Sequence, residues 1–298
     1  MDTKKVGFIG LGNMGFPMAS NLLKAGYTVY GVDVNKMNEK RFAEIGGNIG
    51  FTSATLPSEV NLIFTSLPTP PIVESVYLGN EGLVENGKTS LTLVDLSTVS
   101  PELNKTIAKA ALQNGTQYLG APVSGSVTGA EAASLSVMVG GNKETYDFAL
   151  PYLKAIGKNI FHVGEDHGVG TVVKLINNLM AGIHTQAVAE ALSIADAAGL
   201  DHNIVYEIVN VSSGQSDVFR RNYKNFIAKD EYYKGAFTTE LLLKDLRLAN
   251  YVSNSFETKL PLGEALVDYF ESNIKGYEDK DMSTAYLMLT EQKVEPAK

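Results

Sequence analysis

A short apolar run near the start of the chain leads directly into a glycine-rich turn, and this junction constrains the fold more than any other feature. The run covers residues 6–9, a helical pattern covers residues 16–25, and a second apolar run over residues 28–32 ends at Asp33. Strand, glycine turn, helix, strand and an acid about 20 residues further on form the dinucleotide-binding fingerprint of a Rossmann-type domain. We therefore predict cofactor binding by the turn residues Gly10, Leu11, Gly12, Asn13, Met14 and Gly15.

The three glycines of this turn have separate mechanical roles. Gly10 makes the tight turn, Gly12 lets the backbone approach the pyrophosphate, and Gly15 lets the helix pack closely on the strand. The free N–H groups and positive potential of the helix N-terminus favour the phosphates.

Asp33 bears on the choice between the two nicotinamide cofactors. A carboxylate at the end of the second strand accepts hydrogen bonds from the ribose hydroxyls and repels a 2′-phosphate. Val34 and Asn35 supply no arginine for such a phosphate, whereas Lys36 and Arg41 are close enough in sequence to compensate in part. The sequence therefore favours NAD and leaves NADP open.

Further apolar runs at residues 62–65, 91–94 and 135–139 alternate with helical patterns. This alternation predicts a doubly wound, mostly parallel sheet with crossover helices. In such sheets ligands bind outside the carboxyl ends of the strands. We therefore expect cofactor contacts at Leu67 and Pro68 in the proline-rich turn after residues 62–65, although a plain strand-to-helix turn explains these residues equally well.

The long helical pattern over residues 168–199 predicts a helix of about 45 Å, longer than one small domain needs. Its apolar residues fall on nearly all faces, so we expect it to be buried nearly all round and to lie where two domains meet. Lys174 and Asn178 are four residues apart and share one face. Burying an ammonium or a carboxamide among apolar residues costs free energy unless the group has a hydrogen-bonding partner or a function that requires it. A lysine that reaches solvent and an asparagine bonded to a loop remain the alternative.

Residues 164–170 contain the predicted boundary between a Rossmann domain over residues 1–165 and an all-α domain over residues 166–298. The second domain shows only helical patterns, at residues 203–210, 237–253, 263–273 and 281–291. Phe237 and Lys244 are two helical turns apart and can face one cleft. Taken alone, Lys244 and Asp245 are typical of a helix with solvated charges.

The composition excludes several classes of function. The 298 residues include no cysteine, which rules out disulfides, thiolate catalysis and zinc–cysteine sites. A net charge of −8 argues against general nucleic-acid binding. We find neither a signal-peptide pattern nor an apolar run long enough to span a membrane, so we expect a cytoplasmic protein. The histidines lack metal-ligand spacing, and we expect no metal.

Four stretches resemble the β-hydroxyacid dehydrogenase family, in order and spacing, across almost the whole chain. They are GFIGLGNMGFPMASNLLKAGY (7–27), APVSGSVTGAEAASLSVMVGG (121–141), GVGTVVKLINNLM (168–180) and KDL (244–246). The family includes 3-hydroxyisobutyrate dehydrogenase, tartronate semialdehyde (2-hydroxy-3-oxopropionate) reductase and the glyoxylate/succinic semialdehyde reductases.

This resemblance implies roles for particular residues. Lys174 would be the general acid/base, and Asn178 would orient the substrate beside it. Partial burial beside the positive nicotinamide would favour the neutral amine of the lysine. A further set would hold the substrate carboxylate, namely Ser124, Gly125 and Ser126. Thr98 would lie at the nicotinamide end, and Lys244, with Phe237 near it, would close that side of the cleft.

The chain departs from the family pattern at three positions. Gly120 stands where the family often has Asp, Ser126 where it has a second Gly, and Ala133 where it has Gly. Ser126 resembles the semialdehyde-reductase branch, whereas Asp33 without a following Arg resembles the NAD-linked members. The two features point to different subfamilies.

We therefore predict an NAD(P)-dependent oxidoreductase that interconverts a short β-hydroxy acid and its semialdehyde, of the 3-hydroxyisobutyrate dehydrogenase or 2-hydroxy-3-oxopropionate reductase type. An imine reductase of the same superfamily is one alternative, although that branch usually replaces the lysine found here at Lys174. A non-catalytic nicotinamide-binding regulator is another. The expected partners are a small carboxylate-bearing substrate and further copies of the chain, as a homodimer or homotetramer.

Overall fold

The computed structural model describes residues 4–233 and 237–291. The chain divides into two compact units, the first ending at Lys174 and the second beginning at Leu175. Helix α8 (Val169–Ala197) is continuous through this division.

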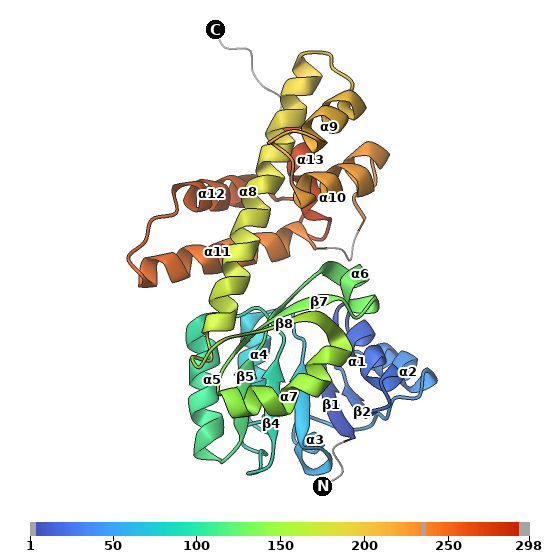
Figure 1. Cartoon of the computed structure of the whole chain (residues 1–298), viewed down its shortest axis with the longest axis vertical. Coiled ribbons are helices and arrows are strands. Elements are labelled where there is room, and N and C mark those ends of the chain that lie inside the picture. Colours follow the sequence, from blue (N-terminus) through green and yellow to red (C-terminus); the bar gives the residue numbers. More distant parts are fainter. Residues whose placement is uncertain (1–3, 234–236, 292–298) are drawn as a thin grey trace. The chain divides into compact units, whose positions relative to one another are not determined.

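Within the described residues, the first unit contains one eight-stranded sheet of order β2-β1-β3-β4-β5-β7-β6, with β8 paired to β7 (Figure 1). Neighbours from β2 to β5 are parallel, β7 is antiparallel to β5 and β6, and β8 is parallel to β7. The strands are β1 (Lys5–Ile9), β2 (Thr28–Val32), β3 (Leu62–Thr65), β4 (Thr92–Asp95), β5 (Gln117–Gly120), β6 (Val123–Ser124), β7 (Leu135–Gly140) and β8 (Gly157–Gly164). The predicted doubly wound, mostly parallel sheet is confirmed.

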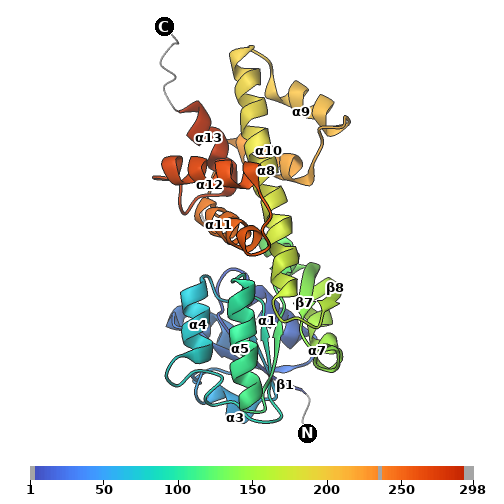
Figure 2. The same cartoon turned by 90° about the vertical axis from the view of Figure 1, so that its left-hand side faces the viewer.

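Helices cover both faces of this sheet (Figure 2). One face packs against α1 (Gly15–Lys24), α2 (Lys36–Glu44) and α7 (Lys143–Ile156), and the other against α3 (Leu56–Glu59), α4 (Pro70–Leu78) and α5 (Pro101–Gln113). Successive strand residues therefore enter different cores: Phe64 joins the first and Ile63 the second. Because both faces are buried, the strands appear in the sequence as continuous apolar runs.

The order of the strands determines where a ligand can bind in this unit. The chain moves outward from β1 to β2 on one side and from β1 through β3 to β5 on the other. Ligands in open α/β sheets bind at this reversal, outside the carboxyl ends of the strands. The glycine turn after β1 and the loop after β3 both lie at that edge.

The described part of the second unit is helical, as predicted. It contains the rest of α8, α9 (His202–Asn210), α10 (Asp217–Asn225), η1 (Ile227–Lys229), α11 (Thr239–Ser255), α12 (Pro261–Asn273), η2 (Met282–Thr284) and α13 (Ala285–Thr290). Leu242 and Leu246 of α11 pack with Phe270 of α12 in its main core. In the parts of the chain that the structure describes, no helix has both the length and the apolar character needed to cross a membrane.

Two predictions about the helices are wrong. Helix α8 is not buried all round, because Val173, Ile176, Met180 and Ile194 are exposed. Their apolar character does not by itself determine burial, which depends on what other elements cover them. Phe237 is not on the same helix as Lys244, since Thr238 caps α11 with its side chain and the helix begins one residue later.

Candidate active site

The glycine turn has the shape of a phosphate-binding site. Gly10 has φ +93°, and a Cβ atom there would lie 2.2 Å from the carbonyl oxygen of Ser66. A Cβ at Gly15 would lie 1.8 Å from the carbonyl oxygen of Gly10. At Gly12, by contrast, no atom of the described residues, the two chain neighbours aside, lies within 4 Å of the corresponding position. The fold itself therefore requires two of the glycines, and the third leaves open space that fits the close approach of a pyrophosphate.

Asp33 ties this turn to the end of β2. Its Oδ2 accepts hydrogen bonds from the Leu11 backbone N–H (2.7 Å) and from Asn38 Nδ2 (3.2 Å), and its Oδ1 accepts one from the Asn35 backbone N–H (2.7 Å). The three donors leave acceptor capacity on the carboxylate for the ribose hydroxyls of a cofactor.

The two cations near Asp33 already have partners. Lys36 Nζ lies 2.9 Å from Oε1 of Glu39, whose side chain is buried. The guanidinium of Arg41 lies over the ring of Phe16, 4.4 Å from its centre. A 2′-phosphate would have to compete with these contacts and with the charge of Asp33 and Glu39.

The loops after β3 and β4 are joined by Ser97, whose role the sequence analysis missed. Ser97 Oγ accepts a hydrogen bond from the Leu67 backbone N–H (2.9 Å). The Ser97 backbone N–H donates to Oδ1 of the buried Asp95 (3.0 Å). Thr98, half-buried, is therefore held beside the loop that contains Leu67 and Pro68.

The run from Ser124 to Ser126 begins in β6 and ends at the first residue of α6 (Ser126–Glu131). Gly125 and Ser126 are exposed, and Ser126 Oγ lies 2.9 Å from Oγ1 of Thr128. Asn21 Nδ2 of α1 donates to the Ala130 carbonyl oxygen (2.6 Å) and so holds α6 against the helix that follows the glycine turn. The exposed hydroxyls are available to an anionic ligand.

The backbone explains one of the three departures from the family pattern, at Gly120, and shows strain at the other two, Ser126 and Ala133. A Cβ atom at Gly120 would lie 2.4 Å from the carbonyl oxygen of His167, so this structure has no room for an aspartate there. Ser126 and Ala133 have φ +61° and +52°, in the left-handed region that favours glycine. Glycine is therefore the least strained residue at both positions.

Lys174 and Asn178 are both buried and lie one turn apart on α8. Asn178 Nδ2 donates to Oδ2 of Asp245 (2.5 Å), and Lys244 Nζ lies 3.1 Å from Oδ1 of the same carboxylate. Asp245 is only 2% exposed. The interpretation of Asp245 as a solvated charge is therefore wrong, because Leu242 and Leu246 on the same helix carry this part of α11 into the core.

The structure thus brings the predicted residues together in two groups. In the first unit, the glycine turn, Asp33 and the loops with Leu67 and Thr98 lie at the carboxyl edge of the sheet. In the second unit, Asn178 and Lys244 meet at Asp245, and Phe237 packs against the core that contains Leu242.

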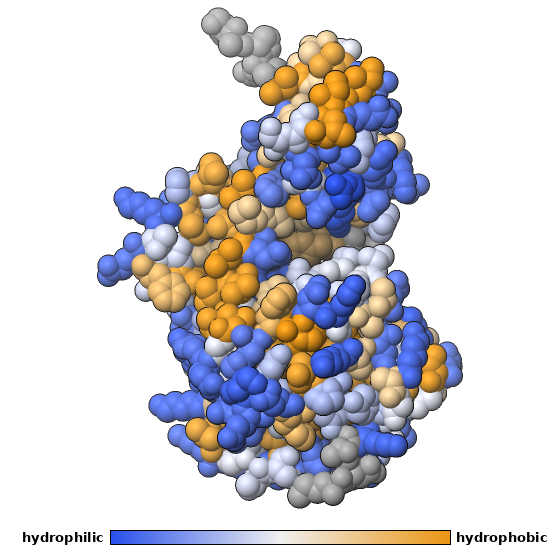
Figure 3. Space-filling view, in the orientation of Figure 1, coloured by the Kyte–Doolittle hydropathy of each residue, from blue (hydrophilic) through white to orange (hydrophobic). Residues whose placement is uncertain are grey.

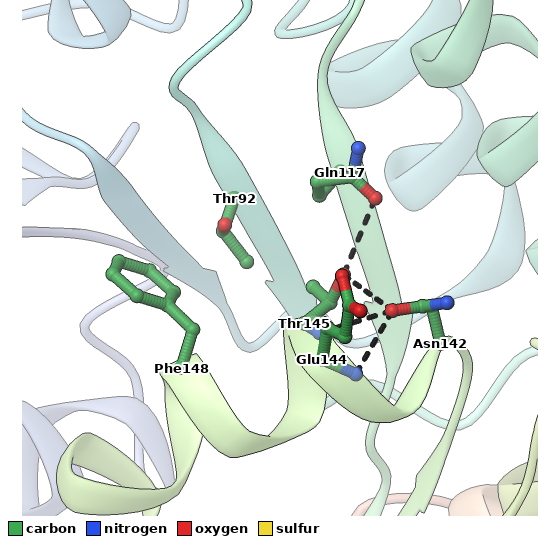
Figure 4. A pocket seen from close by; sticks show the side chains of 6 residues that line it. All are labelled: Thr92, Gln117, Asn142, Glu144, Thr145 and Phe148. Atoms are coloured by element: carbon green, nitrogen blue, oxygen red, sulfur yellow. Dashed lines mark hydrogen bonds between the residues drawn. The ribbon is translucent and has the colours of Figure 1, made fainter.

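A polar pocket of the first unit lies elsewhere (Figure 4). It is lined by Thr92, Gln117, Asn142, Glu144, Thr145 and Phe148. Thr92 and Gln117 begin β4 and β5, so this pocket is not at the carboxyl edge of these strands. Its polar groups bond to one another, since Thr145 Oγ1 donates to Gln117 Oε1 (3.2 Å) and Asn142 caps α7.

Comparisons with known proteins match both parts of the chain. Residues 5–164 match the family model of the NAD binding domain of 6-phosphogluconate dehydrogenase. Residues 168–289 match the model described as NAD-binding of NADP-dependent 3-hydroxyisobutyrate dehydrogenase.

Individual relatives cover nearly the full length. The 2-(hydroxymethyl)glutarate dehydrogenase of Eubacterium barkeri is 39% identical over 280 residues, 94% of this chain and 92% of that protein. The mitochondrial 3-hydroxyisobutyrate dehydrogenase of Drosophila melanogaster is 35% identical over 296 residues, 97% and 90% of the two chains. The solved structure of Mycobacterium tuberculosis 3-hydroxyisobutyrate dehydrogenase with L-serine has a TM-score of 0.87 and 29% identity, and the match covers 96% of this chain and 99% of that one.

The doubly wound sheet with its dinucleotide turn, together with these matches, defines an NAD(P)-dependent oxidoreductase. The chain belongs to the β-hydroxyacid dehydrogenase family. The resemblance on which the sequence-based prediction rested is confirmed.

Proposed function

We propose that this protein oxidises a 2-(hydroxymethyl)carboxylate to its semialdehyde with NAD, or catalyses the reverse reduction. The names of two relatives, 3-hydroxyisobutyrate and 2-(hydroxymethyl)glutarate dehydrogenase, share this chemical unit, a primary alcohol β to a carboxylate. The single observation that best supports the proposal is the pair of buried polar side chains, Lys174 and Asn178, one turn apart on α8.

The proposed roles follow from the chemistry of each group. The bound cofactor supplies hydride acceptance and donation. Lys174 accepts the hydroxyl proton during oxidation and returns it to the carbonyl oxygen during reduction. Asn178 orients the substrate beside the lysine, and the hydroxyls of the half-buried Ser124 and the exposed Ser126 bind its carboxylate.

NAD is the proposed cofactor. Asp33 retains acceptor capacity for the ribose hydroxyls, and its charge opposes a 2′-phosphate. The contacts of Lys36 with Glu39 and of Arg41 with Phe16 support this preference, because both cations would have to give up a partner to bind the extra phosphate.

Lys174 also favours this proposal over an imine reductase, because the imine-reductase branch of the superfamily usually replaces this lysine. A non-catalytic regulator would need neither Lys174 nor Asn178.

The proposed assembly is a homodimer or homotetramer. Ile204 and Ile208 share one face of α9 and are both 59% exposed, and Val211, the residue after this helix, is 84% exposed. Figure 3 shows apolar side chains gathered where the end of α8 meets α9. Such a face is typical of an interface between subunits. Sedimentation velocity should show an oligomer that the variant Ile204→Lys/Ile208→Lys weakens, and a monomeric wild type would refute the assembly.

Cofactor-coupled assays test the proposed reaction. Oxidation of 3-hydroxyisobutyrate and 2-(hydroxymethyl)glutarate should be measured with NAD and NADP in parallel. Reduction of tartronate semialdehyde, methylmalonate semialdehyde, succinic semialdehyde, glyoxylate and a cyclic imine should be measured with NADH and NADPH. Turnover of a 2-(hydroxymethyl)carboxylate with NAD supports the proposal. Turnover of the imine alone, or cofactor binding without any turnover, would contradict it.

A further inference from the structure

A chain of buried polar side chains runs through the first unit to the start of α8. Asp95, at the end of β4, is 0% exposed and accepts a hydrogen bond from Thr65 Oγ1 (2.7 Å). Since the single hydroxyl hydrogen of Thr65 is used there, the hydroxyl of Tyr77, 2.7 Å from Thr65 Oγ1, is the donor in that contact. Tyr77, Thr65 and Asp95 are therefore joined in sequence, with each hydroxyl donating to the next group.

Tyr118 connects this core to α8, because its ring packs edge-on against the ring of Tyr77, with the ring centres 5.6 Å apart. Burial, followed by the charge of Asp95, raises the pKa of Tyr118. The Tyr118 hydroxyl donates its one hydrogen to Asn104 Oδ1 (2.6 Å), and Asn104 Nδ2 donates to Oγ1 of Thr171 (2.7 Å). All these side chains are buried, so water does not compete for the bonds.

The last member of the chain lies in the first turn of α8. Thr171 is three residues before Lys174, and side chains with this spacing are neighbours on one side of a helix. The first turn of a helix lacks intrahelical partners for its N–H groups and tends to fray. Here a Cβ atom at Gly170 would lie 2.1 Å from the Met138 carbonyl oxygen, so the backbone is pressed against β7. The bond from Asn104 then fixes the rotation of the turn.

Packing alone does not explain a charge at this place. A buried carboxylate is costly, and apolar side chains of similar volume commonly stabilise a core as well or better. The same carboxylate also holds Ser97, which fixes the loop with Leu67. The same buried polar core thus contacts a predicted cofactor loop at one end and, through Tyr118, the first turn of α8 at the other.

We propose that Tyr118, Asn104 and Thr171 form a positioning chain that sets the first turn of α8 and through it the amine of Lys174. This inference rests on the proposed function, in which Lys174 transfers the proton. Thr171 and Asn104 are positioning residues and do not touch the substrate.

The test compares two buried threonines of α8. Thr171→Val removes the acceptor for Asn104 with little change in volume, and Thr171→Ser keeps it. Thr185→Val is the matched control, because Thr185 is a buried hydroxyl of the same helix that accepts from Asn222 Nδ2 (3.2 Å). Each variant is assayed for kcat, KM and cofactor Kd. The rate at which an amine-reactive reagent labels Lys174 in the full chain is measured by mass spectrometry at fixed pH.

Thr171→Val should lower kcat about tenfold or more, with KM and cofactor Kd changed less than about twofold, because a misplaced catalytic group affects the chemical step. Lys174 should be labelled faster in this variant, and Thr171→Ser and Thr185→Val should resemble the wild type. If Thr171→Val does not fold, Tyr118→Phe interrupts the same chain and should give the same pattern.

The other outcomes separate the two proposals. Wild-type kcat and labelling in Thr171→Val would overturn the inference, as would equal losses in Thr171→Val and Thr185→Val. If the wild type turns over no substrate of the panel while labelling still accelerates only in Thr171→Val, the proposed reaction fails and the positioning of Lys174 is supported.

Discussion

The side-chain amide of Asn178 donates a hydrogen bond to the buried carboxylate of Asp245, which is 67 residues further along the chain. Because a carboxylate only accepts, this contact determines which end of the amide is the nitrogen. The remaining oxygen, Oδ1, accepts from Asn177 Nδ2 (2.9 Å). Asp245 therefore orients a residue that the proposed reaction assigns to the substrate.

Asp245→Asn should lower kcat at least about tenfold, because an amide at this position can accept or donate and no longer fixes the orientation of Asn178. The variant also removes the ion pair with Lys244. Steady-state kinetics with the best substrate of the panel measures the effect. Asp268→Asn, at an exposed aspartate of the second unit, is the control and should leave kcat unchanged. Equal kcat in both variants would show that Asp245 does not contribute to catalysis by orienting Asn178.

Lys174→Ala should lower kcat by at least about a hundredfold, as expected for loss of a general acid/base. Its effect on cofactor Kd, measured by quenching of protein fluorescence, should be small. Lys105→Ala, at an exposed lysine paired with Asp166, controls for loss of a positive charge from the first unit. Near wild-type turnover by Lys174→Ala would contradict the proposed proton transfer.

Asp33→Ala should weaken NAD binding about tenfold or more, because hydrogen bonds to a charged group contribute about 1.5–3 kcal/mol. Binding of NADP should weaken less, so the ratio of the Kd for NADP to the Kd for NAD should decrease. Isothermal titration of both cofactors into both proteins measures this. Asp33→Asn keeps the shape of the side chain and part of its acceptor capacity. The NAD affinity of this variant should therefore lie between those of the wild type and Asp33→Ala. Unchanged NAD affinity in Asp33→Ala would refute the ribose contact.

Ala133→Gly should raise the free energy of unfolding of the first unit by about 0.5–1 kcal/mol, because glycine relieves the left-handed backbone at φ +52°. The neighbouring Ala132 has φ −81°, so Ala132→Gly should lower that free energy by a similar amount. Urea unfolding of the two variants compares adjacent residues in one loop. Destabilisation by both would show that the strain at Ala133 is absent in solution.

His167 makes stability depend on pH near neutrality. Burial lowers its pKa, and the contact with the Tyr118 backbone and the charges of Asp166 and Glu165 offset this only in part. Between the folded value and the unfolded value of about 6.5, the unfolded chain binds more protons than the folded one. The free energy of unfolding should therefore fall as pH drops below about 6.5.

Proton NMR of the imidazole groups should give His167 a pKa below 6.5 in the folded protein. His167→Gln should flatten the dependence of unfolding on pH in this range, and His184→Gln controls for the loss of a histidine in general. A folded pKa of His167 above 6.5 would reverse the sign and contradict the prediction.

Local patterns in the sequence determined much of the fold. The runs that form β2 and β3 end where predicted, at Val32 and Thr65. All four residues of β3 are buried, and a strand covered on both faces appears as a continuous run in the sequence. The roles expected of Gly10 and Gly15 match the close contacts in the structure, since these depend on residues within one strand, turn and helix. The spacing of Lys174 and Asn178 likewise follows from helical geometry alone.

The sequence by itself thus determined the Rossmann-type sheet, the long helix, the family and the pair of polar residues on α8. Only the tertiary structure decided that Asp245 is buried against Asn178, and that Asn104 reaches Thr171. Both contacts join residues 67 positions apart. It also decided that one side of α8 is exposed, which its apolar residues alone did not predict. The spacing of apolar residues shows which of them share a face of one helix or strand. Whether that face is buried, and which side chains it contacts, depends on the other elements that the fold places beside it.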